Sequence, residues 1–416
     1  MEKFIIEGGN SLNGTVEISG AKNAALPVLI ATILAPGVHT IRNVPNLRDT
    51  RTTKKLLEII GAKVTFENNI MQIDTTNCDN PVAPYDLVKT MRASFYVLGP
   101  LLGRYGTATV SLPGGCAWGP RPVDIHLSAM EALGAKVDLA SGNIVATVDK
   151  LVGTEFEMRF PSVGATGNML MAAVLAEGTT IIKNAAKEPE ISCLVDFLNE
   201  TGAKISGKGT AELTIEGVNE LHPVDFSIIP DRIEAGTFLI AAAITQGEIT
   251  LKNVEPDHLG KVLEILEQVG AEIQIRQNEI RLKQENRPKS INAVAEVYPG
   301  FPTDLQPQLI ALLSVAKGNS RVIDTVYNDR FKHVPELVRL GAKIAMDDNM
   351  AVISGVKQLA GGPVMCPDIR AGAALVLAAL VAEGTSVVDR IYHIDRGYEN
   401  FEENLTNLGG TIRRSD

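Results

Sequence analysis

The chain has 416 residues, of which 45% are apolar and 21% are charged, so it can bury sizeable hydrophobic cores and should form about two or three domains. The net charge of −10 and the pI near 5.3 argue against nucleic acid and anionic membranes as partners, because neither binds a broadly acidic surface. The first ten residues do not have the pattern of a secretory signal, and the longest apolar tract, 371–382, is too short to span a bilayer. Four widely separated cysteines without metal-ligand spacing indicate free thiols in a reducing cytoplasm.

A small-residue tripeptide that ends an amphipathic helical pattern recurs six times along the chain, at intervals of 68 to 73 residues. The helical patterns at 54–60 and 262–269 are two examples, and each is followed by short alternating strands. The first glycine of each tripeptide supplies the left-handed residue that ends the helix. These glycines are Gly61, Gly134, Gly202, Gly270, Gly341 and Gly409.

Each repeat also begins with a second kind of helix, which is apolar almost all round and must therefore be enclosed by the rest of the fold. The run 238–244, Phe-Leu-Ile-Ala-Ala-Ala-Ile, is one example. Every such helix is followed by a glycine and a strand, as at 247–251. The six predicted buried helices are 24–34, 93–103, 166–176, 234–245, 305–316 and 371–382.

The predicted architecture is an α/β (α+β) fold of six βαβαββ repeats, with one buried and one exposed helix in each. Sheets outside buried helices make an inside-out α/β barrel. Six repeats exceed one core, so we expect three in a domain of residues 21–229 and three in a second domain of residues 1–20 and 230–416. The N-terminal strand 4–6 should pair in the second domain. We expect a hinge at the two crossings and an active-site cleft between the domains.

Polar residues gather just before or within the first turns of the buried helices. If these helices run parallel, their N-termini meet on one face of each domain and make an anion site. For each of Asp231, Asp304 and Asp368 taken singly, a second interpretation is favoured, in which the aspartate only caps a helix. Cations at helix beginnings oppose the helix dipole and need another reason, which a polyanionic ligand would supply. The cations in question are Lys22, Arg92, Arg121, Arg330, Arg370 and Arg396.

A Gly/Pro-rich loop at 111–124 carries a thiol, Cys116, beside Arg121. The glycines around the thiol would allow this loop to rearrange and close over a ligand. Spacing alone leaves two interpretations open: Cys116 is placed for chemistry, or it is an incidental loop cysteine.

These residues resemble the UDP-N-acetylglucosamine enolpyruvyl transferase family, also called UDP-N-acetylglucosamine 1-carboxyvinyltransferases. The resemblance covers essentially the whole chain, and its most specific segments are 20–26, 113–116 with 121–124, 299–304 and 395–399. It implies transfer of the enolpyruvyl group of phosphoenolpyruvate to the 3-hydroxyl of UDP-N-acetylglucosamine with release of phosphate. The family reaction is an addition–elimination through a tetrahedral intermediate and is the first committed step of peptidoglycan synthesis.

The resemblance also implies residue roles. Cys116 matches the family's general acid, which fosfomycin would alkylate, and Asp304 matches the carboxylate that takes the sugar hydroxyl proton. Lys22, Arg121 and Arg396 match the cations around the phosphate and carboxylate of phosphoenolpyruvate. The implied substrate contacts are Asn23, Arg92, Arg121, Pro122, Val123, Asp124, Ile125, Ser162, Val163, Gly164 and Val326, supported by Arg330, Asp368 and Arg370.

The expected partners are the two small-molecule substrates, with no nucleic acid, no membrane, no metal and no organic cofactor, and a monomer is the expected state. One alternative is the sister enolpyruvyl transferase that uses shikimate 3-phosphate, but segments 113–116 and 121–124 favour the UDP-sugar. A second alternative is a non-catalytic protein that binds a nucleotide sugar. The presence of Cys116, Lys22 and Asp304 together argues against it.

Overall fold

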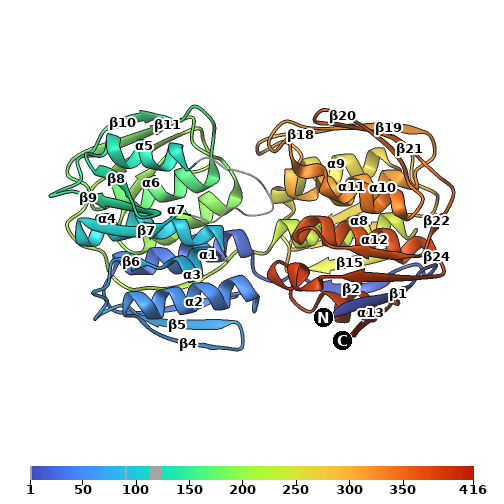
Figure 1. Cartoon of the computed structure of the whole chain (residues 1–416), viewed down its shortest axis with the longest axis horizontal. Helices are drawn as coiled ribbons and strands as arrows, with labels where there is room; N and C mark the ends of the chain where they lie inside the picture. Colours follow the sequence, from blue (N-terminus) through green and yellow to red (C-terminus); the bar gives the residue numbers. More distant parts are fainter. Residues whose placement is uncertain (1, 90, 113–122) are drawn as a thin grey trace. The chain divides into compact units, whose positions relative to one another are not determined.

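The computed structural model describes residues 2–89, 91–112 and 123–416. The chain divides into two compact units (Figure 1). We call Gly20–Ile229 the Lys22 unit, and Met1–Ser19 together with Pro230–Asp416 the Asp304 unit. Each unit has its own core of buried apolar side chains.

Each unit contains three four-stranded sheets with the same strand pattern, in which one parallel pair is extended by two antiparallel neighbours. In the Lys22 unit the sheets are β14(Asp225–Ser227)-β3(Val38–Arg42)-β5(Ile70–Asp74)-β4(Lys63–Glu67), β6(Val82–Ala83)-β7(Thr107–Ser111)-β9(Asn143–Thr147)-β8(Lys136–Ala140) and β10(Glu155–Glu157)-β11(Thr179–Lys183)-β13(Glu212–Glu216)-β12(Lys204–Ser206).

The Asp304 unit repeats this pattern. Its sheets are β2(Asn13–Glu17)-β15(Glu248–Lys252)-β17(Glu279–Lys283)-β16(Glu272–Arg276), β18(Asn292–Ala295)-β19(Asn319–Asp324)-β21(Met350–Ser354)-β20(Lys343–Asp347) and β23(Pro363–Met365)-β25(Thr385–Asp389)-β1(Lys3–Glu7)-β26(Thr411–Ser415), with a short pair β22(Leu359–Ala360)-β24(Ala382–Glu383).

Three of the six repeats complete their sheet with a strand from a distant part of the chain, and one of these strands is β2, which pairs in parallel with β15 of the fourth repeat. β14 lies at the end of the Lys22 unit in sequence, yet it pairs in parallel with β3 of the first repeat. β1 lies at the start of the chain, and it inserts between β25 and β26 of the last repeat, as expected for the N-terminal strand. Each unit is therefore joined end to end by strand pairing.

The buried helices lie inside each unit and the sheets lie outside them, as the apolar patterns predict. The buried helices are α1(Lys22–Ala31), α4(Leu98–Tyr105) and α6(Val163–Ala173) in the Lys22 unit, and α8(Arg232–Ile244), α10(Gln306–Ser314) and α12(Ile369–Val381) in the Asp304 unit. The outer helices are α2(Arg48–Ile60), α3(Tyr85–Val88), α5(Asp124–Ala132), α7(Pro189–Glu200), α9(Gly260–Gln268), α11(Val334–Arg339) and α13(Phe401–Asn407).

Most predicted buried helices begin too late in the chain. The structure starts them two or three residues earlier, so Lys22 and Arg370 lie in first turns, whereas Ser162, Asp231 and Asp368 precede their helices as N-caps. The N–H groups of the first turn have no intrahelical acceptor, so polar residues that can bind them or their ligands are favoured there although the apolar pattern has not begun. The predicted helix 93–103 is divided into a 3-10 helix, η2(Arg92–Val97), and α4, because Pro100 fits only the first turn of an α-helix.

The six glycines predicted to end the outer helices all have positive φ, between 92° and 112°. Gly61, for example, is the left-handed cap of α2 and its N–H reaches Leu57 and Glu58. This confirms the repeat that the tripeptides indicated.

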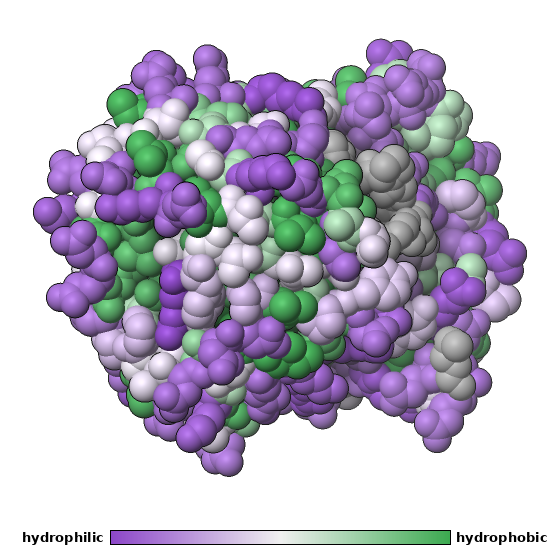
Figure 2. Space-filling model, turned by 60° about the vertical axis from the view of Figure 1, so that its left-hand side comes forward, coloured by the Kyte–Doolittle hydropathy of each residue, from purple (hydrophilic) through white to green (hydrophobic). Residues whose placement is uncertain are grey.

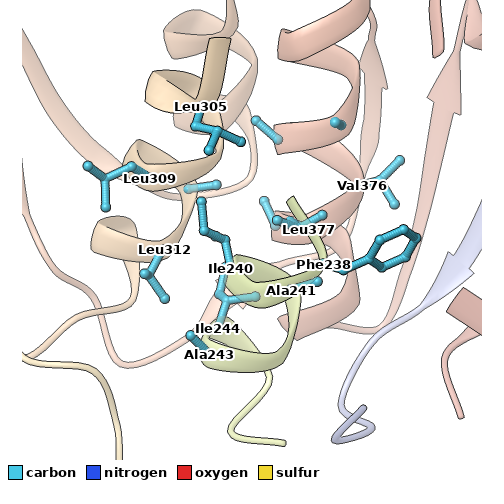
Figure 3. Close-up of a cluster of buried hydrophobic side chains, with 14 of the residues drawn as sticks. Phe238, Ile240, Ala241, Ala243, Ile244, Leu305, Leu309, Leu312, Val376 and Leu377 are labelled. Carbon is cyan, nitrogen blue, oxygen red and sulfur yellow. The ribbon is translucent and has the colours of Figure 1, made fainter. Parts of the chain in front are cut away.

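The core of the Asp304 unit is formed where α8, α10 and α12 meet, with Phe238, Leu309 and Leu377 packed among them (Figure 3). A Cβ added at Gly236 of α8 would lie 2.3 Å from a methyl group of Leu305, so the glycine lets these elements approach closely. Each fully buried large apolar side chain contributes roughly 1.5–3 kcal/mol to stability.

The surface is largely polar. Figure 2 shows hydrophilic side chains over much of the visible face, with apolar residues between them. No helix among the described residues combines the length and the apolar character needed to cross a membrane.

Candidate active site

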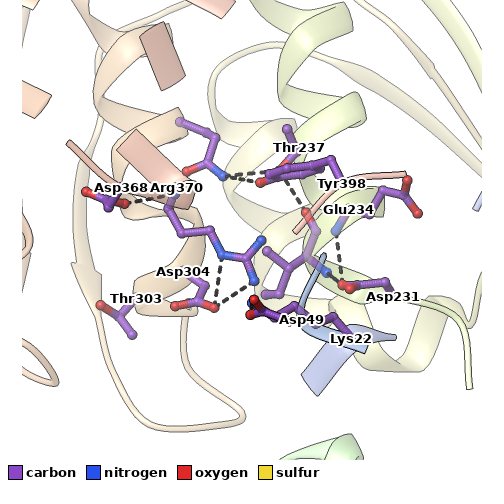
Figure 4. Close-up of polar contacts among 12 residues, drawn as sticks. Lys22, Asp49, Asp231, Glu234, Thr237, Thr303, Asp304, Asp368, Arg370 and Tyr398 are labelled. Atoms are coloured by element: carbon purple, nitrogen blue, oxygen red, sulfur yellow. Dashed lines mark hydrogen bonds and ion pairs between the residues drawn. The ribbon is translucent and has the colours of Figure 1, made fainter. Parts of the chain in front are cut away.

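The Asp304 carboxylate is held between two buried arginines. Its Oδ1 accepts a hydrogen bond from Arg330 Nη2 at 2.6 Å, and its Oδ2 accepts from Arg370 Nε and Nη2 at 3.1 and 3.0 Å (Figure 4 shows the Arg370 contacts). The arginine side chains are 6% and 5% exposed, whereas that of Asp304 is 25% exposed. Charge-assisted bonds of this kind fix the direction of the carboxylate.

Three elements supply these side chains. Asp304 lies in η4(Thr303–Leu305), Arg330 begins η5(Arg330–His333), and Arg370 lies in the first turn of α12. Burial alone would lower the pKa of the Arg370 guanidinium, but the Asp304 carboxylate and Tyr398 raise that pKa above its ordinary value. The Tyr398 ring also faces the Arg370 guanidinium at 5.5 Å, which gives this buried cation a second favourable contact.

The structure separates Asp304 from the two other aspartates that helix capping could explain. Asp231 and Asp368 are N-caps, since each accepts hydrogen bonds from two backbone N–H groups in the first turn of its helix. Asp304 lies within η4, whose N-cap is Pro302, so it does not occupy the cap position. The capping interpretation therefore holds for Asp231 and Asp368 and fails for Asp304.

The Lys22 unit carries a different charge pair. Lys22 is the first residue of α1, and its Nζ lies 2.8 Å from Asp49 Oδ2, in the first turn of α2. Both side chains are buried, and Asn23 beside them is partly buried. A lysine at the N-terminus of a helix opposes the dipole, and the Asp49 carboxylate offsets that cost.

Two predicted substrate-binding runs lie next to each other in the same unit. Val123 precedes α5, and Asp124 and Ile125 begin it, while Ser162 caps α6 by accepting a hydrogen bond from Ala165 N at 3.3 Å. Asp124 pairs with Arg159, just before Ser162, and the ring of His126 lies against Gly164. Val163 and Gly164 form the first turn of α6, so both runs lie at helix beginnings.

The remaining predicted site residues fall into two groups. Cys116, Arg121 and Pro122 lie outside the described residues. The backbone of Arg92 begins η2 in the Lys22 unit, and Arg396 ends η6(Ile391–Arg396) in the Asp304 unit. Within the described ranges, no group of His, Cys, Asp and Glu side chains is arranged to hold a metal ion.

A further buried carboxylate, Glu234, lies in the first turn of α8. It accepts hydrogen bonds from Ser19 N at 2.8 Å and Ser19 Oγ at 3.4 Å, where the chain crosses between the units. Burial, followed by the neighbouring Asp231 charge, raises the pKa of Glu234 to about 8. Glu234 is therefore a proton-binding group near neutral pH.

Comparison with known proteins identifies the family of this chain. The family model for EPSP synthase (3-phosphoshikimate 1-carboxyvinyltransferase) matches residues 6–405. The UDP-N-acetylglucosamine 1-carboxyvinyltransferases of Chloroherpeton thalassium and Desulfosudis oleivorans are 54% and 52% identical to this chain, and the matches cover 100% of it and 97% and 99% of the relatives. The chain belongs to the UDP-N-acetylglucosamine 1-carboxyvinyltransferase family.

Solved structures share the fold of this chain. The enolpyruvyl transferase NikO from Streptomyces tendae has a TM-score of 0.91 at 26% identity, with 100% of this chain and 99% of that chain covered. An EPSP synthase from Acinetobacter baumannii has a TM-score of 0.76 at 19% identity over the full length of both chains, which shows the shared fold alone.

The sequence analysis missed three residues that the structure places beside Lys22 or beside the group of Asp304, Arg330 and Arg370. Asp49 contacts Lys22, Tyr398 faces Arg370, and Asp324 binds the segment next to Asp304. Tyr398 lies within the recognised segment 395–399, which was a usable signal. Asp49 has the sequence surroundings of an ordinary acidic residue in the first turn of a helix, and Asp324 has those of the last residue of a strand. Neither position is therefore marked in the sequence as part of a site.

Proposed function

We propose that this protein transfers the enolpyruvyl group of phosphoenolpyruvate to the 3-hydroxyl of UDP-N-acetylglucosamine and releases phosphate. The observation that carries this function is the match at 52 to 54% identity, over the full chain, to relatives named for this reaction. The reaction is the first committed step of peptidoglycan synthesis in the family that the sequence resembles.

Asp304 is the proposed general base. It takes the proton of the 3-hydroxyl as the sugar oxygen forms a bond to C2 of phosphoenolpyruvate, while Cys116 protonates C3. The C2–O bond to phosphate then breaks, C3 loses a proton, and the enolpyruvyl ether and phosphate are released. In support, the Asp304 carboxylate is partly exposed, and hydrogen bonds from two arginines fix its direction, as a base that must meet a substrate hydroxyl requires.

The remaining predicted residues supply binding. Lys22, Arg121 and Arg396 are proposed to neutralise the phosphate and carboxylate of phosphoenolpyruvate, since guanidinium and ammonium groups form strong hydrogen bonds to such anions. Arg330, Asp368 and Arg370 support the base. The proposed nucleotide-sugar contacts are Asn23, Arg92, Arg121, Pro122, Val123, Asp124, Ile125, Ser162, Val163, Gly164 and Val326.

The reaction is proposed to take place in the cytoplasm. Three free cysteines among the described residues, Cys78, Cys193 and Cys366, support this location because free thiols persist in a reducing compartment.

Phosphate release tests the proposed function directly. The purified protein is incubated with phosphoenolpyruvate and UDP-N-acetylglucosamine, each substrate is omitted in turn, and shikimate 3-phosphate replaces the sugar in a parallel reaction. We expect release only when phosphoenolpyruvate and the UDP-sugar are both present. Release from phosphoenolpyruvate with shikimate 3-phosphate but not with the UDP-sugar would assign the chain to the sister reaction. No release under any condition would favour a non-catalytic binding protein.

A further inference from the structure

Asp324 lies at the end of β19 and is fully buried, although it carries a carboxylate. Three donors satisfy it. Its Oδ1 accepts from the backbone N–H groups of Val326 and Tyr327 at 3.0 and 2.8 Å, and its Oδ2 accepts from the Thr303 hydroxyl at 2.6 Å. One carboxylate thus binds two segments that are more than 20 residues apart in sequence.

The Thr303 contact extends to the proposed base. Thr303 Oγ1 donates to Asp324 and accepts from Arg330 Nε at 3.2 Å, and Arg330 Nη2 in turn donates to Asp304. The donor and the acceptor are therefore fixed in each hydrogen bond of the series that runs from Asp324 through Thr303 and Arg330 to Asp304. Because the Thr303 hydroxyl hydrogen points at Asp324, a lone pair of the same oxygen is left to accept from Arg330.

A second contact reaches the same arginine. The Tyr327 ring faces the Arg330 guanidinium at 5.3 Å, and Arg330 N donates to Tyr327 O at 3.1 Å. Since Asp324 fixes the Tyr327 backbone, it restrains Arg330 through Tyr327 as well as through Thr303. Asp324 also fixes the amide of Val326, a proposed nucleotide-sugar contact.

We infer that Asp324 is a positioning residue for the proposed reaction, which orients Arg330 and the base Asp304 through Thr303 and, separately, orients Val326 for the nucleotide sugar. This inference rests on the proposed function. It assigns two separable effects to one buried carboxylate: the Thr303 side acts on the chemical step, and the Val326 side acts on sugar binding.

Three substitutions separate the two effects. Asp324→Asn keeps an oxygen for the Val326 and Tyr327 amides but presents an NH₂ group to Thr303, so we expect kcat to fall roughly tenfold, as for other positioning partners, with KM for the UDP-sugar little changed. Thr303→Val removes only the hydroxyl and should reproduce this result, whereas Thr303→Ser should retain activity. Asp324→Ala removes both effects and should also raise KM for the UDP-sugar.

The measurement is steady-state kinetics with each substrate varied, combined with calorimetric binding of UDP-N-acetylglucosamine and thermal unfolding of every variant. KM for phosphoenolpyruvate should stay constant throughout. Asp347→Asn, an exposed aspartate at the end of β20 in the same sheet, is the matched control and should behave as the unsubstituted protein. If Asp324→Ala does not fold, Asp324→Asn and Thr303→Val still carry the test.

Two results would overturn the inference. Unchanged kcat in both Asp324→Asn and Thr303→Val would remove the link to the base. A lower kcat in Asp324→Asn but not in Thr303→Val would show that the effect does not pass through Thr303. An unsubstituted protein that releases no phosphate would instead contradict the proposed function, and the inference would fail with it.

Discussion

The Lys22 unit and the Asp304 unit build the same architecture from three repeats each, but they place different charges at the beginnings of their buried helices. In the Asp304 unit, two buried arginines surround one partly exposed carboxylate. In the Lys22 unit, one buried lysine contacts one buried carboxylate. The repeated fold therefore determines where polar groups are presented, and a few substitutions at those positions determine which chemistry each unit can perform.

The comparison predicts that the base lies in the Asp304 unit. Asp304→Asn keeps the shape of the side chain and removes its ability to accept a proton, so kcat should fall by about 10²-fold or more. Phosphate release under saturating substrates measures this effect, and Asp347→Asn serves as the control. A variant that retains most of its kcat would assign proton transfer to another group.

The buried Lys22–Asp49 pair of the Lys22 unit should contribute to the stability of the folded protein. Asp49→Ala removes the carboxylate beside the Lys22 ammonium, and we expect the free energy of unfolding to fall by about 2–3 kcal/mol. Urea unfolding measures the change. The variant for comparison is a double one that combines Lys22→Met with Asp49→Ala. The double variant should recover part of the loss, because no charge then remains buried; a further loss would contradict the pairing.

Glu234 provides a pH-dependent test in the Asp304 unit. Its pKa is raised to about 8 in the folded protein, from an ordinary value of 4.5, so the folded state binds more protons than the unfolded state between these values. Stability should therefore fall as the pH rises from about 4.5 to 8, and then level off. Glu234→Gln cannot ionise, so it should unfold at a higher temperature than the unsubstituted protein at pH 8, and at a similar temperature near pH 5.

Thermal unfolding across this pH range measures the difference between the two proteins. A difference that stays constant with pH would show that Glu234 does not titrate there.

The exposed pair of Arg42 and Asp225 in the Lys22 unit should show the smallest effect. The two side chains are 49% and 55% exposed, and solvent screens such pairs strongly. Asp225→Asn should leave the unfolding temperature and kcat unchanged. A clear loss of stability would mean that this pair holds β14 against β3.

Local patterns were sufficient for much of the fold. The six glycines with positive φ and the six apolar helices follow from short segments, because helix termination and burial depend on neighbouring residues. Strand β14 in the first sheet could not be found this way, since its pairing with β3 joins residues about 185 positions apart.

The residues of the candidate site also divide into those that local patterns could predict and those that they could not. Asp304, Arg330 and Arg370 could be named from their places at helix beginnings and from the family resemblance, and the structure brings them together. Asp49 and Asp324 could not, because their importance comes from contacts with distant segments and not from their own surroundings in sequence. Capping and ligand binding use the same residue types, so only the geometry separates Asp304 from Asp231 and Asp368.

The most direct test of the central claim is the identity of the product. Phosphoenolpyruvate and UDP-N-acetylglucosamine are incubated with the protein, and the nucleotide sugar is recovered for mass spectrometry and NMR. We predict that the UDP-sugar gains one enolpyruvyl group, attached as an ether at its 3-hydroxyl, in equal amount to the phosphate released. An unmodified UDP-sugar, or an enolpyruvyl group on a different position or a different acceptor, would contradict this prediction.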